Sequence, residues 1–346
     1  MSTFAKSTFN ASVYSASRPL YPTQLYDYIF NYHRHKPNAE WNRAIDLGCG
    51  TGQAMAQLHP FREIIGIDPS ENMIKAAVAN RAFFPASSTG VGVGITDTDH
   101  KFQFRRGSAE NLISAGIENE SVDLVIAAQA CHWFDWSKMW PEMERVLRVG
   151  GTAAFWAYSE FRLPDYPSAT PIIMEYARGS DPFKSLGPYW ERPGRAIYES
   201  YLMDIPSPDQ VQQVTRLSNE ERVFFAGPYH TETLPVSQTL PIIMRKEMRW
   251  RDLLGFLRTW SSVSKYHELY LEDKVRAHDG RFPEDLEIGW ETEVQDIEVG
   301  GGDIVVRFWK DLRSAALDGK GEEAEVGADD LLVVEWPLAL IIVSKM

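Results

Sequence analysis

A glycine-rich turn after a short apolar segment constrains this 346-residue chain more than any other feature. Residues 43–47 predict a buried strand, and the turn after it reads Gly48-Cys49-Gly50-Thr51-Gly52. Glycines at a strand-to-helix turn let the backbone approach a ligand closely. A second apolar segment, residues 63–67, ends at Asp68, 20 residues after Gly48, where an acidic side chain often holds ribose hydroxyls. We therefore expect a ribose-containing ligand at the carboxyl ends of two parallel strands.

Strand and helix patterns alternate through the first 158 residues, which is typical of a parallel α/β sheet. The other elements expected there are a helix after Pro22, helices over 52–58, 70–80 and 136–147, a loop over 85–100, and strands at 101–105, 122–128 and 152–158. We expect Gly150 and Gly151 to stop the helix at 136–147. Later segments predict strands at 222–225 and 241–248, a helix over 250–276, an acidic loop over 317–329, and a strand over 331–343 that returns to the sheet.

Composition and charge disfavour several classes of function. The net charge of −13 argues against nucleic acid and anionic membranes as partners, because both require a basic face. No apolar run approaches the ~18 residues of a membrane span, and the polar start lacks a signal-peptide core, so we expect a cytoplasmic protein. Two cysteines are too few for a disulfide framework or a zinc site, so no metal is expected. The segment Ser344-Lys345-Met346 resembles a peroxisomal targeting tripeptide, although a chain end after a strand is the preferred interpretation.

The residues around the turn distinguish between cofactors. A nicotinamide-type motif needs Gly or Ala where this chain has Gln53, and this chain instead has Asp46 two residues before Gly48. The pattern Asp-x-Gly-x-Gly-x-Gly resembles that of class I S-adenosylmethionine (SAM) methyltransferases. The resemblance implies SAM as cofactor and S-adenosylhomocysteine as product. The expected cofactor residues are Asp46, Gly48, Gly50, Gly52 and Asp68, then Pro69 and Met73 beside the adenine, Ser108, Ala109 and Glu110 after the third strand, Gln129 after the fourth strand, and Arg18.

Longer segments resemble a narrower family. They are Ser17-Arg18-Pro19, Ala130-Cys131-His132-Trp133-Phe134-Asp135, Gly187-Pro188-Tyr189-Trp190-Glu191-Arg192-Pro193-Gly194-Arg195 and Leu257-Arg258-Thr259-Trp260-Ser261. Together they resemble the fungal trans-aconitate methyltransferase family, which includes a yeast methyltransferase that gives resistance to cantharidin. The resemblance implies O-methylation of a carboxylate on a small, multiply charged acid. Such a carboxylate is already ionised at pH 7 and needs no general base, so the enzyme has mainly to align the reacting atoms.

These segments also supply the candidate substrate residues. Carboxylates that are not methylated need arginine partners. The candidates are Arg18, which is also a candidate for the SAM carboxylate, and Arg192, Arg195 and Arg258. Each could equally form a structural ion pair. His132 is the candidate catalytic residue, which either orients the acceptor or acts as a base toward a hydroxyl, and packing is an equal alternative. The aromatic candidates, for which core packing is the alternative, are Trp133, Trp156, Tyr189 and Trp190.

The expected architecture is a Rossmann-like, seven-stranded class I methyltransferase sheet with helices on both faces and an inserted lid. We expect residues 1–40 to cap the cofactor, 41–158 to form the SAM-binding core, 159–290 to form a substrate lid and 291–346 to complete the sheet. The oligomeric state and the acid stay open. Two other functions are compatible with the sequence: O-methylation of a hydroxylated secondary metabolite, and a non-catalytic, regulatory SAM-binding role. A cavity with converging arginines favours the acid, whereas an arginine-poor cavity favours the hydroxylated metabolite.

Overall fold

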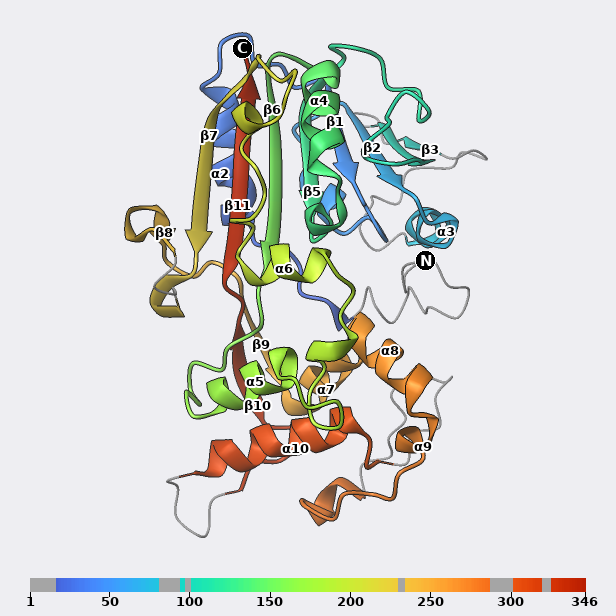
Figure 1. The fold of residues 1–346 in the computed structure, drawn as a ribbon, viewed down its shortest axis with the longest axis vertical. Coiled ribbons are helices and arrows are strands. Elements are labelled where there is room, and N and C mark those ends of the chain that lie inside the picture. The colour runs from blue at the N-terminus through green and yellow to red at the C-terminus, as the bar shows by residue number, and fades with distance from the viewer. Residues whose placement is uncertain (1–16, 81–93, 97–100, 230–233, 287–300, 319–324) are drawn as a thin grey trace.

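The computed structural model describes residues 17–80, 94–96, 101–229, 234–286, 301–318 and 325–346. The first 16 residues of the expected cap, most of the expected loop at 85–100 and residues 291–300 lie outside these ranges. The described chain has a β-sheet with flanking helices at one end and a mostly helical part at the other (Figure 1).

The central strands form the parallel α/β sheet that the sequence predicts. Its order is β3-β4-β2-β1-β5-β6-β11-β7-β8. The strands are β1 (Arg43–Leu47), β2 (Glu63–Asp68), β3 (Gly94–Thr96), β4 (Lys101–Arg106), β5 (Val122–Ala128), β6 (Leu147–Tyr158), β7 (Leu217–Phe225), β8 (Thr239–Leu240) and β11 (Leu338–Lys345). The short strands β3 and β8 extend the edges of the expected seven. The five neighbouring strands β4, β2, β1, β5 and β6 pair in parallel. Strand β11 pairs antiparallel with both β6 and β7 and lies between them. The expected fold class is therefore confirmed.

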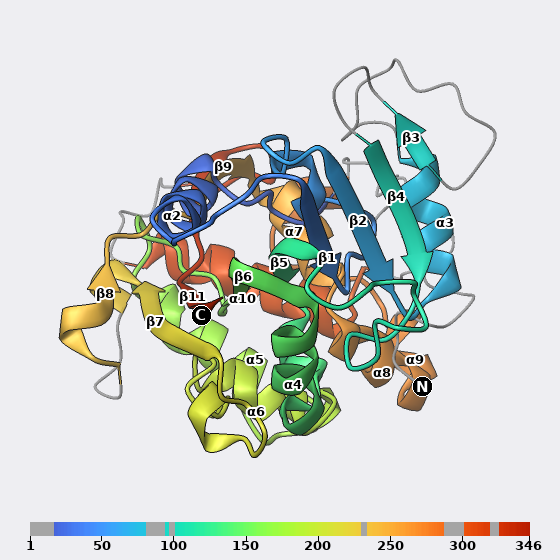
Figure 2. The same ribbon diagram turned by 90° about the horizontal axis from the view of Figure 1, so that it is seen from above.

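Helices cover both faces of the sheet (Figure 2). Helix α2 (Thr23–Arg34) and helix α3 (Glu71–Ala79) pack with Leu124 and Ile126 of β5 in one hydrophobic cluster. Helix α4 (Trp136–Val146) packs on the other face with Val125 and Ala127. Successive side chains of a strand point to opposite faces, so a strand buried on both faces is continuously apolar, as β5 is.

The helical part is built from segments that are distant in sequence. It comprises α5 (Ala169–Arg178), α7 (Trp250–Arg258), α8 (Ser261–Leu269), α9 (Leu271–Lys274), α10 (Ile304–Leu317) and a two-stranded sheet of β9 (Arg245–Arg249) and β10 (Leu331–Glu335). The helix expected over 250–276 is thus divided into three. Its core is aromatic: the rings of Tyr176 and Phe308 stack with centroids 3.7 Å apart. Helix α6 (Gly194–Glu199) lies between this part and the sheet (Figure 1). Strand β7 lies within the stretch expected as a lid but belongs to the main sheet.

Two local expectations are wrong around the glycines. The helix at 136–147 ends at Val146, before Gly150 and Gly151, and both glycines lie inside β6. Gly150 has a φ of +84°, and a Cβ there would come within 2.0 Å of the Pro37 carbonyl oxygen. Close backbone approach, not helix termination, therefore requires this glycine. The turn after β1 continues into a 3-10 helix, η2 (Ala54–Gln57), in place of the expected helix at 52–58.

The late apolar segment at 331–343 forms two strands, not one. Strand β10 pairs with β9 in the helical part, and β11 pairs with β6 and β7 in the main sheet. Pro337 separates them, because proline has no N–H for the ladder and restricts the backbone. The expected return to the main sheet is confirmed for Leu338–Lys345 only.

The segment that resembles a targeting tripeptide is built into the sheet. Ser344 and Lys345 are buried. The Lys345 ammonium donates to the Glu120 carboxylate at 2.9 Å and to the Glu144 and Leu147 carbonyl oxygens at 2.6 and 2.9 Å. Ser344 and Lys345 are therefore part of strand β11 itself.

Candidate active site

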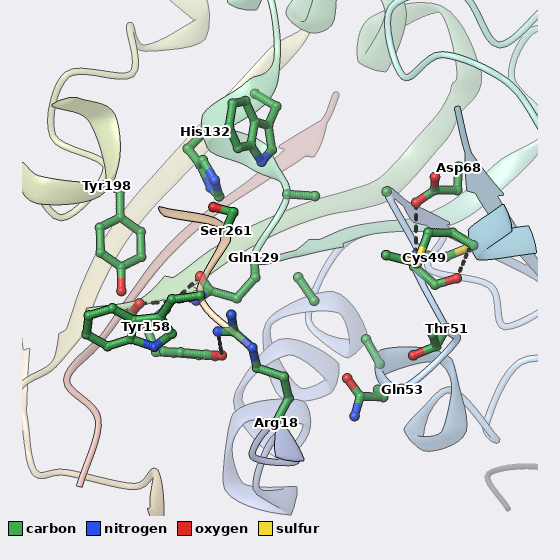
Figure 3. A pocket seen from close by; sticks show the side chains of 18 of the residues that line it. Arg18, Cys49, Thr51, Gln53, Asp68, Gln129, His132, Tyr158, Tyr198 and Ser261 are labelled. Carbon is green, nitrogen blue, oxygen red and sulfur yellow. Dashed lines mark hydrogen bonds between the residues drawn. The ribbon is translucent and has the colours of Figure 1, made fainter. Parts of the chain in front are cut away.

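A cavity of about 450 Å³ opens at the carboxyl ends of β1, β2, β5 and β6. In an open α/β sheet, ligands bind at this edge, where the strand order reverses. Here it reverses between β1 and β5. Asp68, Cys49 and Thr51 gather at one side of the cavity, His132, Tyr158 and Tyr198 at the other, and Gln129 lies between them (Figure 3). We call the first side the cofactor end and the second the acceptor end.

The glycine turn is fixed to the neighbouring strand. The backbone N–H groups of Gly48 and Cys49 both donate to the Ile67 carbonyl of β2, at 2.8 and 3.1 Å. Gly48 has a φ of +67°, and a Cβ there would lie 2.5 Å from the Ala130 Cβ. Gly52 has a φ of +87° and closes the turn on the Cys49 carbonyl, but it does not line the cavity. The glycines therefore shape the turn as the sequence predicts.

Asp68 lies at the end of β2 and is held from both sides. One carboxylate oxygen accepts from the Gly50 N–H at 3.0 Å and the other from the Ser70 N–H at 2.8 Å. Burial raises the pKa of this carboxyl, and the two backbone donors oppose that shift. Each oxygen accepts one backbone bond, so lone pairs are left for a pair of ligand hydroxyls in the cavity.

Asp46 is the second carboxylate at the cofactor end. It is 1 % exposed, and within the described residues neither of its oxygens has a hydrogen-bond partner. Burial and the neighbouring Asp68 raise its pKa well above the usual range. The Thr51 hydroxyl is likewise buried and unpaired in that part of the chain. Buried polar groups without partners are costly, so this end suits a ligand with donors.

The other expected cofactor residues divide into two groups. Pro69, Met73 and Gln129 line the cavity. The Gln129 amide donates to the Tyr158 carbonyl at 3.2 Å and accepts from the Tyr158 N–H at 3.1 Å, which fixes the ends of β5 and β6 relative to each other. The residues expected after the third strand do not line the cavity; they are Ser108, Ala109 and Glu110. The Glu110 carboxylate instead accepts from the Asp135 N–H and the Ser108 hydroxyl.

His132 lies at the acceptor end, in the 3-10 helix η4 (Cys131–Trp133) after β5. Its Nδ1 is buried and has no hydrogen-bond partner within the described ranges. Burial, together with the nearby Arg195 guanidinium, lowers the His132 pKa from 6.5 to about 3. The imidazole is therefore neutral at pH 7, and as a base it is weak.

The expected aromatic residues are also divided. Trp133 and Trp190 line the cavity, and Trp133 is 40 % exposed. Trp156 is fully buried in β6, where Tyr21 and Tyr26 pack edge-on against it at 5.4 and 5.9 Å. Tyr189 is buried in the helical part, and its hydroxyl donates to the Pro182 carbonyl. Neither Trp156 nor Tyr189 lines the cavity, so core packing accounts for both.

The four candidate arginines do not converge on the cavity. Arg192 is exposed and Arg258 pairs with Asp303 at 3.1 Å, and neither lines the cavity. Arg195 lines it but pairs with Glu160 at 2.5 Å and with Glu199 at 2.6 Å. Arg18 lines it too, and donates to the Tyr158 hydroxyl at 2.9 Å and the Thr259 carbonyl at 3.0 Å.

The residues at the acceptor end that sequence reasoning missed include Glu160, Tyr198 and Phe256. Glu160 lies two residues after Tyr158, the last residue of β6, so its place after a strand of the sheet is a signal that could have revealed it. Tyr198 and Phe256 belong to helices α6 and α7, where a buried aromatic residue is indistinguishable in sequence from core packing.

Comparisons with known proteins find methyltransferases. Residues 45–155 match the family model described as a methyltransferase domain. The chain is 31 % identical over 199 residues to CRG1 of Saccharomyces cerevisiae, described as a probable SAM-dependent methyltransferase. The aligned residues make up 57 % of this chain and 61 % of that protein. This chain is also 26 % identical over 330 residues to the methyltransferase cfoB of Aspergillus candidus, and that alignment covers 86 % of this chain and 91 % of cfoB. A structure from Anaeromyxobacter dehalogenans, solved as a candidate type II methyltransferase, shares the fold with a TM-score of 0.57, at 21 % identity over 95 % of this chain and 97 % of that one.

The chain therefore has the Rossmann-like fold of class I methyltransferases, with the glycine turn at the switch point of the sheet, and contains a methyltransferase domain over residues 45–155. Its methyltransferase domain contains the strands and the turn that build the cofactor end. In the described ranges, no helix is long and apolar enough to cross a membrane, and no group of three or more His, Cys, Asp or Glu side chains could hold a metal ion.

The cofactor end fits SAM. The unpaired Asp46 carboxylate and Thr51 hydroxyl match a ligand with an ammonium group, and Asp68 matches a ribose diol. When bound, SAM supplies a methyl group on a sulfonium, which an acceptor lone pair takes while the sulfur retains the electrons of the broken C–S bond. For that transfer, the residues that line the cavity would have to bind and orient the two reactants and exclude water.

Arg258 provides a test of its structural role. Asp303 is fully buried, accepts from Arg258, and also caps α10 through the Val305 and Val306 N–H groups. Removing one partner of a buried pair leaves a charge without compensation. We expect Arg258→Ala to lower the free energy of unfolding by about 3 kcal/mol, and to leave the KM for the acceptor unchanged. Urea denaturation and steady-state kinetics check this, with Arg192→Ala as the control that changes neither. An increased KM in a stably folded Arg258→Ala would contradict the assignment.

Proposed function

We propose that this enzyme methylates a carboxylate on a small acceptor whose skeleton is aromatic or otherwise apolar. The observation that carries the proposal is the lining of the acceptor end. Its side chains are mainly aromatic, among them Trp133, Phe134, Tyr158, Phe161, Trp190, Tyr198, Phe256 and Trp260. Such surfaces bind flat apolar ligands, and a few polar groups set their orientation.

The chemistry of His132 favours a carboxylate over a hydroxyl as the methyl acceptor. A hydroxyl needs a base whose pKa lies near the working pH. The pKa of His132 is about 3, which makes it unsuited to take that proton. A carboxylate is ionised without help, and a neutral imidazole beside it can still accept or donate a hydrogen bond.

A polycarboxylate such as trans-aconitate is the second candidate. The resemblance of the sequence to trans-aconitate methyltransferases supports it, and so does the presence of two arginines, Arg18 and Arg195, in the cavity lining. The ion pairs of Arg195 with Glu160 and Glu199 count against it, because they compensate the charge that a second carboxylate would need.

The test is methyl transfer from SAM to three acceptors: phenylacetate, 4-methylphenol and trans-aconitate. Mass spectrometry before and after mild alkali separates a base-labile ester from a stable ether. We expect an ester from phenylacetate, and a rate that is constant from pH 6 to 8, because neither the carboxylate nor His132 titrates there. Ester formation from trans-aconitate alone would favour the polycarboxylate. An ether product would overturn the proposal in favour of a hydroxyl acceptor. So would a rate that falls as the pH is lowered, with an apparent pKa near 6.5. Intact SAM binding without turnover of any acceptor would favour a non-catalytic role.

A further inference from the structure

Helix α6 brings two hydrogen-bond donors to one wall of the acceptor end. Arg195 and Tyr198 are three residues apart and therefore lie on the same face of the helix. Gly194 permits the close approach of α6 to η4, because a Cβ there would lie 2.9 Å from the His132 carbonyl oxygen. As a result the Tyr198 ring lies 6.0 Å from the His132 ring, edge to face.

The Tyr198 hydroxyl is available to a ligand. Tyr198 lines the cavity, and within the described residues its hydroxyl makes no hydrogen bond. Figure 3 shows the ring beside His132 with the hydroxyl directed toward the side where Tyr158 and Arg18 lie. Burial, with Glu160 close by, raises its pKa well above the usual range, so the hydroxyl stays protonated and can donate.

Arg195 is held in one orientation. Its Nε donates to Glu199 at 2.6 Å and its Nη2 to Glu160 at 2.5 Å, and its Cζ lies 4.4 Å from the Trp190 ring centroid and 4.9 Å from that of Tyr198. Its remaining nitrogen, Nη1, makes no hydrogen bond within the described residues, and Arg195 lines the cavity. Glu160 is itself buried and also pairs with Arg178 at 2.6 Å. The two arginines and two glutamates of this network carry no net formal charge.

We propose that the Tyr198 hydroxyl and Arg195 Nη1 together bind one oxyanion of the acceptor, and that Glu160 and Glu199 hold Arg195 in place and restrict the site to a single anionic group. The proposal deepens the proposed function and rests on it. It makes Tyr198 and Arg195 binding residues, and Glu160 and Glu199 residues that position Arg195 and set specificity. A preorganised donor pair selects an oxyanion without the cost of ordering flexible side chains.

The test measures binding, not turnover, on the full chain saturated with S-adenosylhomocysteine. The probes are phenylacetate and the neutral 2-phenylethanol, titrated calorimetrically. We expect phenylacetate to bind about tenfold tighter, and Tyr198→Phe to reduce this ratio about tenfold, as for the loss of one hydrogen bond to a charged group. The affinity for S-adenosylhomocysteine stays the same. Tyr201→Phe is the matched control, because Tyr201 lies three residues further on, packs in the core and does not line the cavity.

A second variant tests charge compensation. Glu160→Gln keeps the shape of the side chain but removes its charge, so we expect trans-aconitate to gain affinity about fivefold relative to phenylacetate. If Glu160→Gln fails to fold, Glu199→Gln, which is more exposed, tests the same point. Equal losses for both probes in Tyr198→Phe, or no binding of phenylacetate while S-adenosylhomocysteine binds, would overturn the proposal. Intact discrimination between the probes without methyl transfer would overturn only the proposed function.

Discussion

Replacing Asp68 by alanine is expected to raise the Kd for SAM about 100-fold. Asp68 accepts one backbone N–H on each oxygen, so its carboxylate is already oriented before a ligand arrives. Two hydrogen bonds from ribose hydroxyls to this carboxylate are together worth about 3 kcal/mol, which corresponds to that factor. Isothermal titration with SAM and with S-adenosylhomocysteine measures the change.

The control for Asp68 is Glu71→Gln, in the adjacent helix α3. Glu71 is exposed, pairs with Lys75 on the surface and lies three residues after Asp68, so its replacement removes a nearby charge without touching the cavity. We expect unchanged affinity for SAM in this variant. A loss of affinity as large as that of Asp68→Ala would mean that general electrostatics, and not direct contact, gives Asp68 its effect.

Gly48→Ala is expected to have the second large effect, on stability. The φ of +67° is unfavourable for alanine, and the new Cβ would lie 2.5 Å from the Ala130 Cβ. Left-handed strain and overpacking together cost about 2–4 kcal/mol. Urea denaturation followed by tryptophan fluorescence measures the loss.

Gly50→Ala separates the two causes. Gly50 has a φ of +52°, but no atom lies within 4 Å of a Cβ built there. Only the backbone strain applies, so we expect a smaller loss of about 1–2 kcal/mol. If both variants lose the same stability, the contact with Ala130 contributes nothing, and strain alone explains the glycine at position 48.

Only part of the segments that resemble trans-aconitate methyltransferases lies at the acceptor end. The matched segments do reach the site, because Trp133, Trp190 and Arg195 line the cavity. However, Arg258 pairs with Asp303 and Arg192 lies outside the lining. The segments therefore identify the wall of the acceptor end, whereas the charge that the wall presents depends on residues outside those segments, such as Glu160.

The sequence by itself determined the strands at the centre of the sheet, the turn after β1 and the carboxylate at the end of β2. These features are local. A strand buried on both faces must be continuously apolar, as residues 122–128 are, and a turn with positive φ at Gly48 and Gly50 requires glycines at those positions. Their spacing along the chain is sufficient to place Asp46 and Asp68 at one edge of a parallel sheet.

Only the tertiary structure decided which side chains form the acceptor end and what charge they carry. Arg195 meets Glu160 across 35 positions of sequence, and Arg258 meets Asp303 across 45. Strand β11 lies between β6 and β7 in the sheet but begins 180 residues after the end of β6. The sequence around an arginine does not show whether its side chain faces a ligand or a buried carboxylate. The partner depends on how distant elements pack together. The same packing of α6 against η4 brings Tyr198 beside His132 and so makes it part of the cavity wall.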